Sequence, residues 1–129
     1  MTPELTALTF AGILQVIQIF IYIPNSIKQV GHDAAYSPRD KNIDLKDRAG
    51  RIQRAMSNHF EGLILFTIAV VVVTLGDTSN IVTQICAWTY VVARVLYIPA
   101  YIFGWVPWRS YIWTVGLMAT AIMMIAALL

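Results

Sequence analysis

The chain has 129 residues, of which 58% are hydrophobic and only 12% are charged. Soluble domains carry charge on about 25% of their residues, so this composition indicates a membrane protein. A net charge of +2 with no basic tract argues against nucleic acid as a partner, and a single cysteine excludes an intrachain disulfide.

Four apolar segments are long enough to cross a bilayer, whose core of about 30 Å needs roughly 20 helical residues. In chain order they are Leu5–Ile23, Asn58–Gly76, Ile81–Phe103 and Ser110–Leu129. The second carries only Glu61 as a charged residue, the third carries only Arg94, and the others carry none. The segments lack the alternation of barrel strands, so the sequence predicts an all-α membrane protein with a four-transmembrane-helix bundle.

We expect a single domain over residues 1–129. Its helices are predicted at approximately 5–30, 56–76, 80–103 and 108–129, with a cytoplasmic loop at 31–55. The stretch from Lys28 to Arg54 holds seven of the nine Lys and Arg residues. By the positive-inside rule this stretch is cytoplasmic, and four spans then place both termini on the far side of the membrane.

Polar side chains recur at helical spacing on two of these spans. On the second span, positions i, i+4 and i+7 form one stripe: Arg54, Asn58 and Glu61. On the third, positions i, i+3 and i+7 form another: Arg94, Tyr97 and Tyr101. Arg109 opens the fourth span at a similar depth. Together they predict a positively charged pocket in the cytoplasmic half of the bundle. Because arginine matches carboxylates bidentately, the expected ligand carries carboxylates.

Most members of this set also have a simpler explanation, and Arg54 could merely satisfy the positive-inside orientation. Glu61 would hold either Arg94, as a structural ion pair between two helices, or the ammonium group of a ligand. Arg109 could extend to the lipid headgroups, and the two tyrosines could be core aromatics. These separate explanations do not explain why all of the residues lie on facing stripes at the same depth in the membrane.

Other chemistry-bearing residues carry weaker signals. His59 adjoins Asn58 but projects about 100° away from it on a helix, so we expect it to anchor the helix at the membrane interface. Cys86 lies in an apolar span, where a buried inert thiol is expected. Two histidines without a cysteine or second carboxylate at ligand spacing predict no metal site.

Two stretches, "RIQRAMSNHFEGLILF" and "ARVLYIPAYIFGWVPWRSYIW", resemble the MAPEG family, membrane-associated proteins in eicosanoid and glutathione metabolism. The resemblance rests on Arg-x-x-x-Asn-x-x-Glu from Arg54, Arg-x-x-Tyr-x-x-x-Tyr from Arg94, and the arginine that opens the last helix, Arg109. It covers the whole chain in topology. It implies a homotrimer that binds glutathione between neighbouring subunits, near the cytoplasmic half of the bundle.

The resemblance also implies residue roles. It assigns glutathione binding to a set of polar residues: Arg54, Asn58, Glu61, Arg94, Tyr97 and Tyr101, with Ser110 and Lys28 as further candidates. Arg109 would be catalytic, because a guanidinium beside the sulfur favours the thiolate over a thiol with a pKa of roughly 8.5. The implied protein is an integral membrane glutathione transferase or peroxidase that needs glutathione and no metal. Its second substrate would be a hydrophobic electrophile or a lipid hydroperoxide, arriving from membrane lipid along a groove lined by the first and last helices.

The chain departs from the family pattern at Met56, Ser57 and Trp113, and aligning Arg109 needs a one-residue gap. These departures leave the acceptor substrate open and favour a broad detoxification enzyme over a dedicated synthase. Two alternatives remain: a noncatalytic lipid-binding scaffold of the same family, and a binder of another small anionic thiol. The short loops suggest a multi-pass protein of a bacterial inner membrane.

Overall fold

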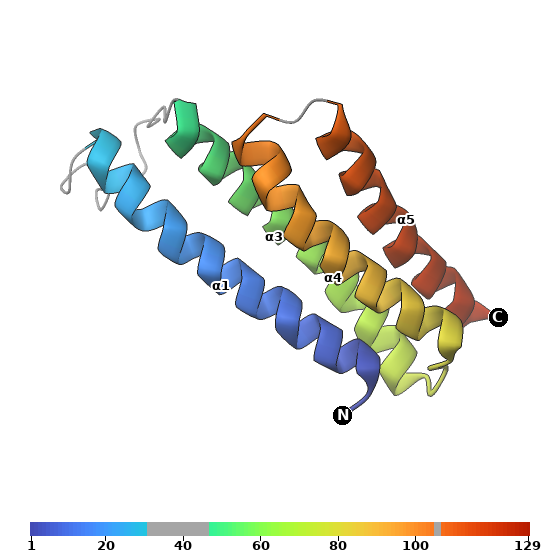
Figure 1. Ribbon diagram of the computed structural model, residues 1–129. Helices are drawn as coiled ribbons and strands as arrows, with labels where there is room; N and C mark the ends of the chain where they lie inside the picture. Colours follow the sequence, from blue (N-terminus) through green and yellow to red (C-terminus); the bar gives the residue numbers. More distant parts are fainter. Residues whose placement is uncertain (31–46, 105–106) are drawn as a thin grey trace.

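The computed structural model describes residues 1–30, 47–104 and 107–129, which form a bundle of long helices (Figure 1). In chain order these helices are α1 (Pro3–Val30), α3 (Asp47–Leu75), α4 (Ile81–Ile102) and α5 (Trp108–Leu128). Each contains a segment long and apolar enough to cross a membrane. The predicted all-α architecture with four candidate spans is therefore confirmed.

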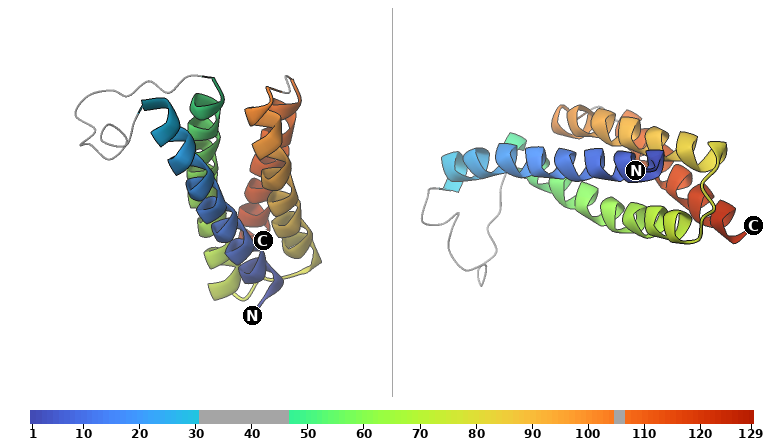
Figure 2. Two further views of the ribbon diagram at one scale, coloured as in Figure 1. Left: turned by 60° about the vertical axis from the view of Figure 1, so that its left-hand side comes forward. Right: turned by 90° about the horizontal axis from the view of Figure 1, so that it is seen from below.

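The helices pack so that α4 lies between α1 and α5, with α3 behind it (Figure 1). Both α1 and α5 contact α3 and α4, whereas α1 and α5 make no contact with each other among the described residues. The two chain termini lie at the same end of the bundle as the turn between α3 and α4 (Figure 2). The end of α4 and the starts of α3 and α5 lie at the opposite end.

The start of α3 differs from the sequence prediction, which placed it near residue 56. The helix begins at Asp47, so residues 47–55 are helical and not part of a loop. The physical reason is that this charged stretch also has an apolar face, on which Ile52 and Ala55 are buried against the bundle. The rest of the predicted loop, residues 31–46, lies outside the described residues. The other helix limits agree with the prediction within two residues.

The core is built from small residues and a few large side chains. Ala7 and Ala11 of α1 are fully buried, which lets this helix approach its neighbours closely. Phe66 of α3 and Tyr90 of α4 stack with ring centroids 3.9 Å apart and an interplanar angle of 13°. Most large apolar side chains instead point outward, as expected for helices surrounded by lipid.

Local polar bonds fix the turn between α3 and α4. At Gly76 an added Cβ would lie 2.8 Å from the carbonyl oxygen of Val72, so only glycine fits without a shift of the backbone. Asn80 then caps α4, accepting hydrogen bonds from the backbone N–H groups of Val82 and Thr83 at 2.9 and 3.1 Å. The Thr83 hydroxyl completes this capping box by accepting from the backbone N–H of Asn80.

Glu4, one residue before the first predicted span, connects α1 to this turn. Its carboxylate is fully buried and accepts hydrogen bonds from the hydroxyls of Ser79, at 2.8 Å, and Thr83, at 2.7 Å. These two bonds offset part of the desolvation of the carboxylate. They hold the end of the bundle that lies opposite the charged residues described next.

Candidate functional site

Two of the predicted arginines meet at one tyrosine where α4 ends and α5 begins. The Nε of Arg54, on α3, donates a hydrogen bond of 3.1 Å to the hydroxyl of Tyr101, on α4. The guanidinium carbon of Arg109 lies 5.0 Å from the centroid of the same ring. Cation–π attraction therefore holds Arg109 against α4, where it is half-buried. Three helices thus contribute to one cluster, which we call the arginine–tyrosine cluster (Arg54, Arg94, Tyr97, Tyr101 and Arg109).

The deeper half of the arginine–tyrosine cluster is organised around Arg94. Its side chain is only 3% exposed, and its guanidinium carbon lies 4.5 Å from the centroid of the Tyr97 ring. Tyr97 in turn lies 5.6 Å from Tyr101, measured between ring centroids, which joins the two halves. Arg94 donates from Nε to Nδ1 of His59 at 3.0 Å and from Nη1 to Oδ1 of Asn58 at 3.2 Å. Its Nη2 has no hydrogen-bond partner among the described residues.

His59 is not an interfacial anchor, so that expectation was wrong. The side chain is fully buried, because α1 packs over the face of α3 that carries it. Its Nε2 lies 3.0 Å from the carbonyl oxygen of Ala11. Since a carbonyl can only accept and the Nε of Arg94 can only donate, the histidine is neutral, with its proton on Nε2. His59 therefore positions Arg94 by linking it to α1.

Replacing His59 with leucine is expected to destabilise the protein by about 1–3 kcal/mol, because the variant leaves the Nε of Arg94 unpaired in a buried position. The measurement is thermal unfolding of the purified protein in detergent. Ser57→Ala, an exposed position on the same helix, is the matched control and should leave the unfolding temperature unchanged. Equal unfolding temperatures for both variants would show that the link through His59 contributes nothing to stability.

Glu61 does not take part in the ion pair with Arg94 that the sequence left open. It lies on the exposed side of α3, while Arg94 bonds to His59 and Asn58 instead. Glu61 and Arg94 nevertheless line one cavity of about 150 Å³ between α3, α4 and α5. Tyr90, a residue that the sequence stripes did not include, also lines this cavity.

A second hollow, of about 250 Å³, lies between α1 and α3 on the other side of Glu61. Met56 and Ser57, where the chain departs from the family pattern, line it together with Gln15 of α1. Gln15 is 7% exposed, and its amide oxygen has no hydrogen-bond partner among the described residues. The 3.6-residue period would have revealed this glutamine as a polar position on the buried face of α1.

Two candidate residues are not part of the arginine–tyrosine cluster as described. One lies apart from it, and the side chain of the other is outside the described residues. Ser110, next to Arg109, is exposed at the start of α5, and its carbonyl accepts the Thr114 hydroxyl at 2.8 Å. Lys28 lies in the last turns of α1, and its side chain is outside the described residues. Five of the predicted residues thus lie in the arginine–tyrosine cluster. Asn58 is joined to the cluster by its hydrogen bond with Arg94.

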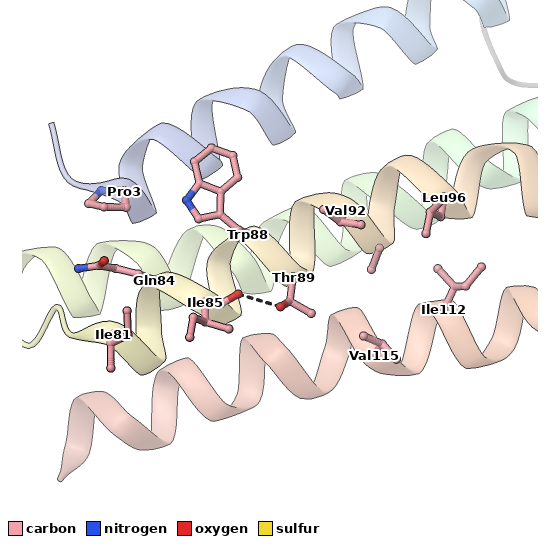
Figure 3. Close-up of a pocket in the computed structure, with 11 residues that line it drawn as sticks. Pro3, Ile81, Gln84, Ile85, Trp88, Thr89, Val92, Leu96, Ile112 and Val115 are labelled. Atoms are coloured by element: carbon pink, nitrogen blue, oxygen red, sulfur yellow. Dashed lines mark hydrogen bonds between the residues drawn. The ribbon is translucent and has the colours of Figure 1, made fainter.

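A groove of about 700 Å³ runs along the outer face of α4 (Figure 3). Trp88 extends toward α1, while Ile112 and Val115 project from α5 toward α4. The Thr89 hydroxyl is already bonded to the carbonyl of Ile85 at 2.8 Å, so the groove surface is largely apolar. We expected a groove between the first and last helices, but α1 contributes only Pro3 to this one, and α4 forms its floor.

Comparison with known proteins identifies the family. No curated protein and no solved structure gave a match to the chain. The sequence model of the MAPEG family, in contrast, matches residues 5–129, which include the four described helices apart from the first two residues of α1. The match agrees with the resemblance found at Arg54, Arg94 and Arg109, and with four helices able to cross a membrane. The chain is therefore an integral, multi-pass membrane protein that belongs to the MAPEG family.

Proposed function

We propose that this protein is a membrane-bound glutathione transferase that activates the thiolate of glutathione and attacks hydrophobic electrophiles from the bilayer. The MAPEG family includes glutathione transferases and peroxidases as well as noncatalytic members. The observation that carries the proposal is the guanidinium of Arg94, which is buried within the membrane span and whose Nη2 has no hydrogen-bond partner among the described residues. A buried charge whose hydrogen bonds are incomplete is costly, and such residues mark functional sites in membrane proteins.

The arrangement of charges suits glutathione, which carries two carboxylates, one ammonium group and one thiol. Arg54 and Arg94 supply fork-shaped donors for carboxylates. Glu61, exposed and close to Asn58 on α3, supplies an acceptor for the ammonium group. Tyr97 and Tyr101 connect these groups into one surface with Arg109, which supports glutathione as the ligand over a simple acid.

Arg109 is the residue best placed to activate the thiol. It lies at the start of α5, half-buried against Tyr101, and not extended away from the bundle. A guanidinium beside the sulfur that lowers the thiol pKa by one to two units stabilises the thiolate by roughly 1.4–2.7 kcal/mol. The thiolate would then attack an electrophilic carbon and form a thioether, while a leaving group such as chloride departs. With a lipid hydroperoxide it would attack the terminal peroxide oxygen and break the O–O bond, releasing the lipid alcohol and leaving the sulfenic acid of glutathione. A second glutathione would convert the sulfenic acid to glutathione disulfide and water, which completes a peroxidase cycle.

The groove along α4 suits the apolar substrate. Ile112, one of its lining residues, follows Arg109 by one turn of α5, so the groove approaches the arginine–tyrosine cluster along the helix. Hydrophobic electrophiles dissolve in the bilayer and therefore reach an apolar groove from the lipid side. This supports a broad range of acceptors, because few polar groups are present in the groove to select one.

Assembly and orientation complete the proposal. We infer a homotrimer, as the resemblance to the family implies, because the exposed Glu61 and the hollow that it shares with Gln15 would gain partners from a neighbouring subunit. The concentration of basic residues between Lys28 and Arg54 supports a cytoplasmic position for that end of the bundle. Both termini would then face away from the cytoplasm, in a bacterial inner membrane.

The proposal is tested with purified protein in detergent or nanodiscs. Isothermal titration should detect glutathione binding, and the protein should conjugate glutathione to chlorodinitrobenzene. Glutathione-dependent reduction of cumene hydroperoxide, measured in parallel, separates peroxidase from transferase activity. Binding of lipid without binding of glutathione would favour the noncatalytic scaffold. Binding of another small anionic thiol in place of glutathione would also contradict the proposal.

A further inference from the structure

Tyr90 has a hydroxyl that the packing of its ring does not explain. The ring stacks on Phe66 and lies against Gly116, where an added Cβ would be 3.7 Å from Cδ2 of the tyrosine. Tyr90 is 2% exposed, and its hydroxyl has no hydrogen-bond partner among the described residues. A phenylalanine would fill the same space without burying an unpaired polar group. The described residues therefore leave this hydroxyl free to bind a ligand.

The hydroxyl lies close to the guanidinium of Arg94. Both groups surround Gly62, where an added Cβ would lie 3.2 Å from the Tyr90 hydroxyl and 3.9 Å from Nη1 of Arg94. Both side chains line the 150 Å³ cavity, and each has a buried atom without a hydrogen-bond partner among the described residues, the hydroxyl of Tyr90 and Nη2 of Arg94. Two neighbouring side chains that each have a donor without a partner among the described residues are suited to bind an anion.

The size and charges of the cavity limit what can bind there. Pockets that bury most of a drug-sized ligand measure about 300–1,000 Å³, so a cavity of about 150 Å³ holds only one end of a tripeptide. Glu61 lines this cavity together with Arg94 and Tyr90. An acidic group beside two donors complements an ammonium and a carboxylate on neighbouring atoms, as in the head of an α-amino acid.

We infer that Tyr90 is a further binding residue: its hydroxyl and Nη2 of Arg94 bind the α-carboxylate at the γ-glutamyl end of glutathione. This inference rests on the proposed function. It adds one binding residue, Tyr90, and the orientation in which glutathione binds. The γ-glutamyl end enters the cavity between α3, α4 and α5. The thiol and the glycyl end remain nearer the start of α5, where Arg109 lies.

Tyr90→Phe tests the inference by isothermal titration of the full-length protein with two ligands. The first is glutathione, and the second is 4-aminobutyryl-cysteinylglycine, which is glutathione without its α-carboxylate. For glutathione the variant should raise Kd about tenfold, as expected for the loss of one hydrogen bond to a charged group. For the ligand without the α-carboxylate, Tyr90→Phe and wild type should have the same Kd. Tyr111→Phe, an exposed tyrosine of α5, is the matched control and should behave as wild type with both ligands.

A second variant keeps the test decisive even if Tyr90→Phe does not fold. Gly62→Ala places a methyl group about where the carboxylate must approach the Tyr90 hydroxyl, so it should weaken glutathione binding selectively in the same comparison. An unchanged Kd for glutathione in a folded variant, or an equal penalty with both ligands, would overturn the inference and leave the proposed function standing. Absence of glutathione binding by the wild type would contradict both the inference and the proposed function.

Discussion

Replacing Arg109 with alanine is expected to lower kcat for glutathione conjugation about 100-fold while changing the Kd of glutathione less than about threefold. The size of this decrease in kcat follows from the loss of one preorganised group that stabilises negative charge on the sulfur. Such a loss typically lowers kcat by a factor of about 10²–10³. Binding should persist because Arg54 and Arg94 remain to hold the carboxylates. Arg109 packs against Tyr101 from the start of α5, so its loss disturbs no buried hydrogen bond of the cluster.

The measurement combines steady-state conjugation of chlorodinitrobenzene with the ultraviolet absorbance of the bound thiolate. The variant should show both a lower rate and less thiolate at neutral pH. Arg51→Ala, an exposed arginine at the start of α3, is the matched control and should retain wild-type kcat. Equal kcat in Arg109→Ala and wild type would show that Arg109 has no part in catalysis.

Replacing Arg94 with methionine is expected to raise the Kd of glutathione at least about 30-fold. Truncating one member of a buried, hydrogen-bonded charge pair typically costs 2–5 kcal/mol, which corresponds to this factor or more. Methionine preserves much of the side-chain length and apolar packing over Tyr97. The protein should remain folded, because an apolar residue in place of a buried charge also removes the cost of desolvating that charge.

Isothermal titration gives the Kd, and thermal unfolding in the same detergent verifies the fold. Arg51→Met is the control for the loss of one positive charge and should leave the Kd near the wild-type value. A folded Arg94→Met variant that binds glutathione normally would show that Arg94 has only a structural role, through His59 and Asn58.

Helical periodicity explains why much of this cluster could be predicted from the sequence. The spacing of Arg94, Tyr97 and Tyr101 fixes one face of a single helix, whatever surrounds that helix. Apolar length likewise predicted the spans, because the bilayer thickness sets the number of residues required. These predictions depend on geometry within one element, which the order of residues determines directly.

The remaining features depend on how helices pack against one another. His59 was expected at an interface because its angle relative to Asn58 was known but the position of α1 was not. Tyr90 was not among the predicted site residues, because its nearness to Arg94 and Gly62 depends on how α3 and α4 pack. The early start of α3 also depends on packing, since Ile52 and Ala55 gain an apolar surface only from neighbouring helices.

The position of both chain ends at one side of the bundle has a practical consequence (Figure 2). Arg54, Tyr101 and Arg109 lie at the other side, where α4 ends and α5 begins. An affinity tag at Met1 or Leu129 would therefore immobilise the protein on a sensor chip with its charged end toward the flowing solution. Kinetics of thiol association could be recorded on such a chip without the anchor obstructing the approach.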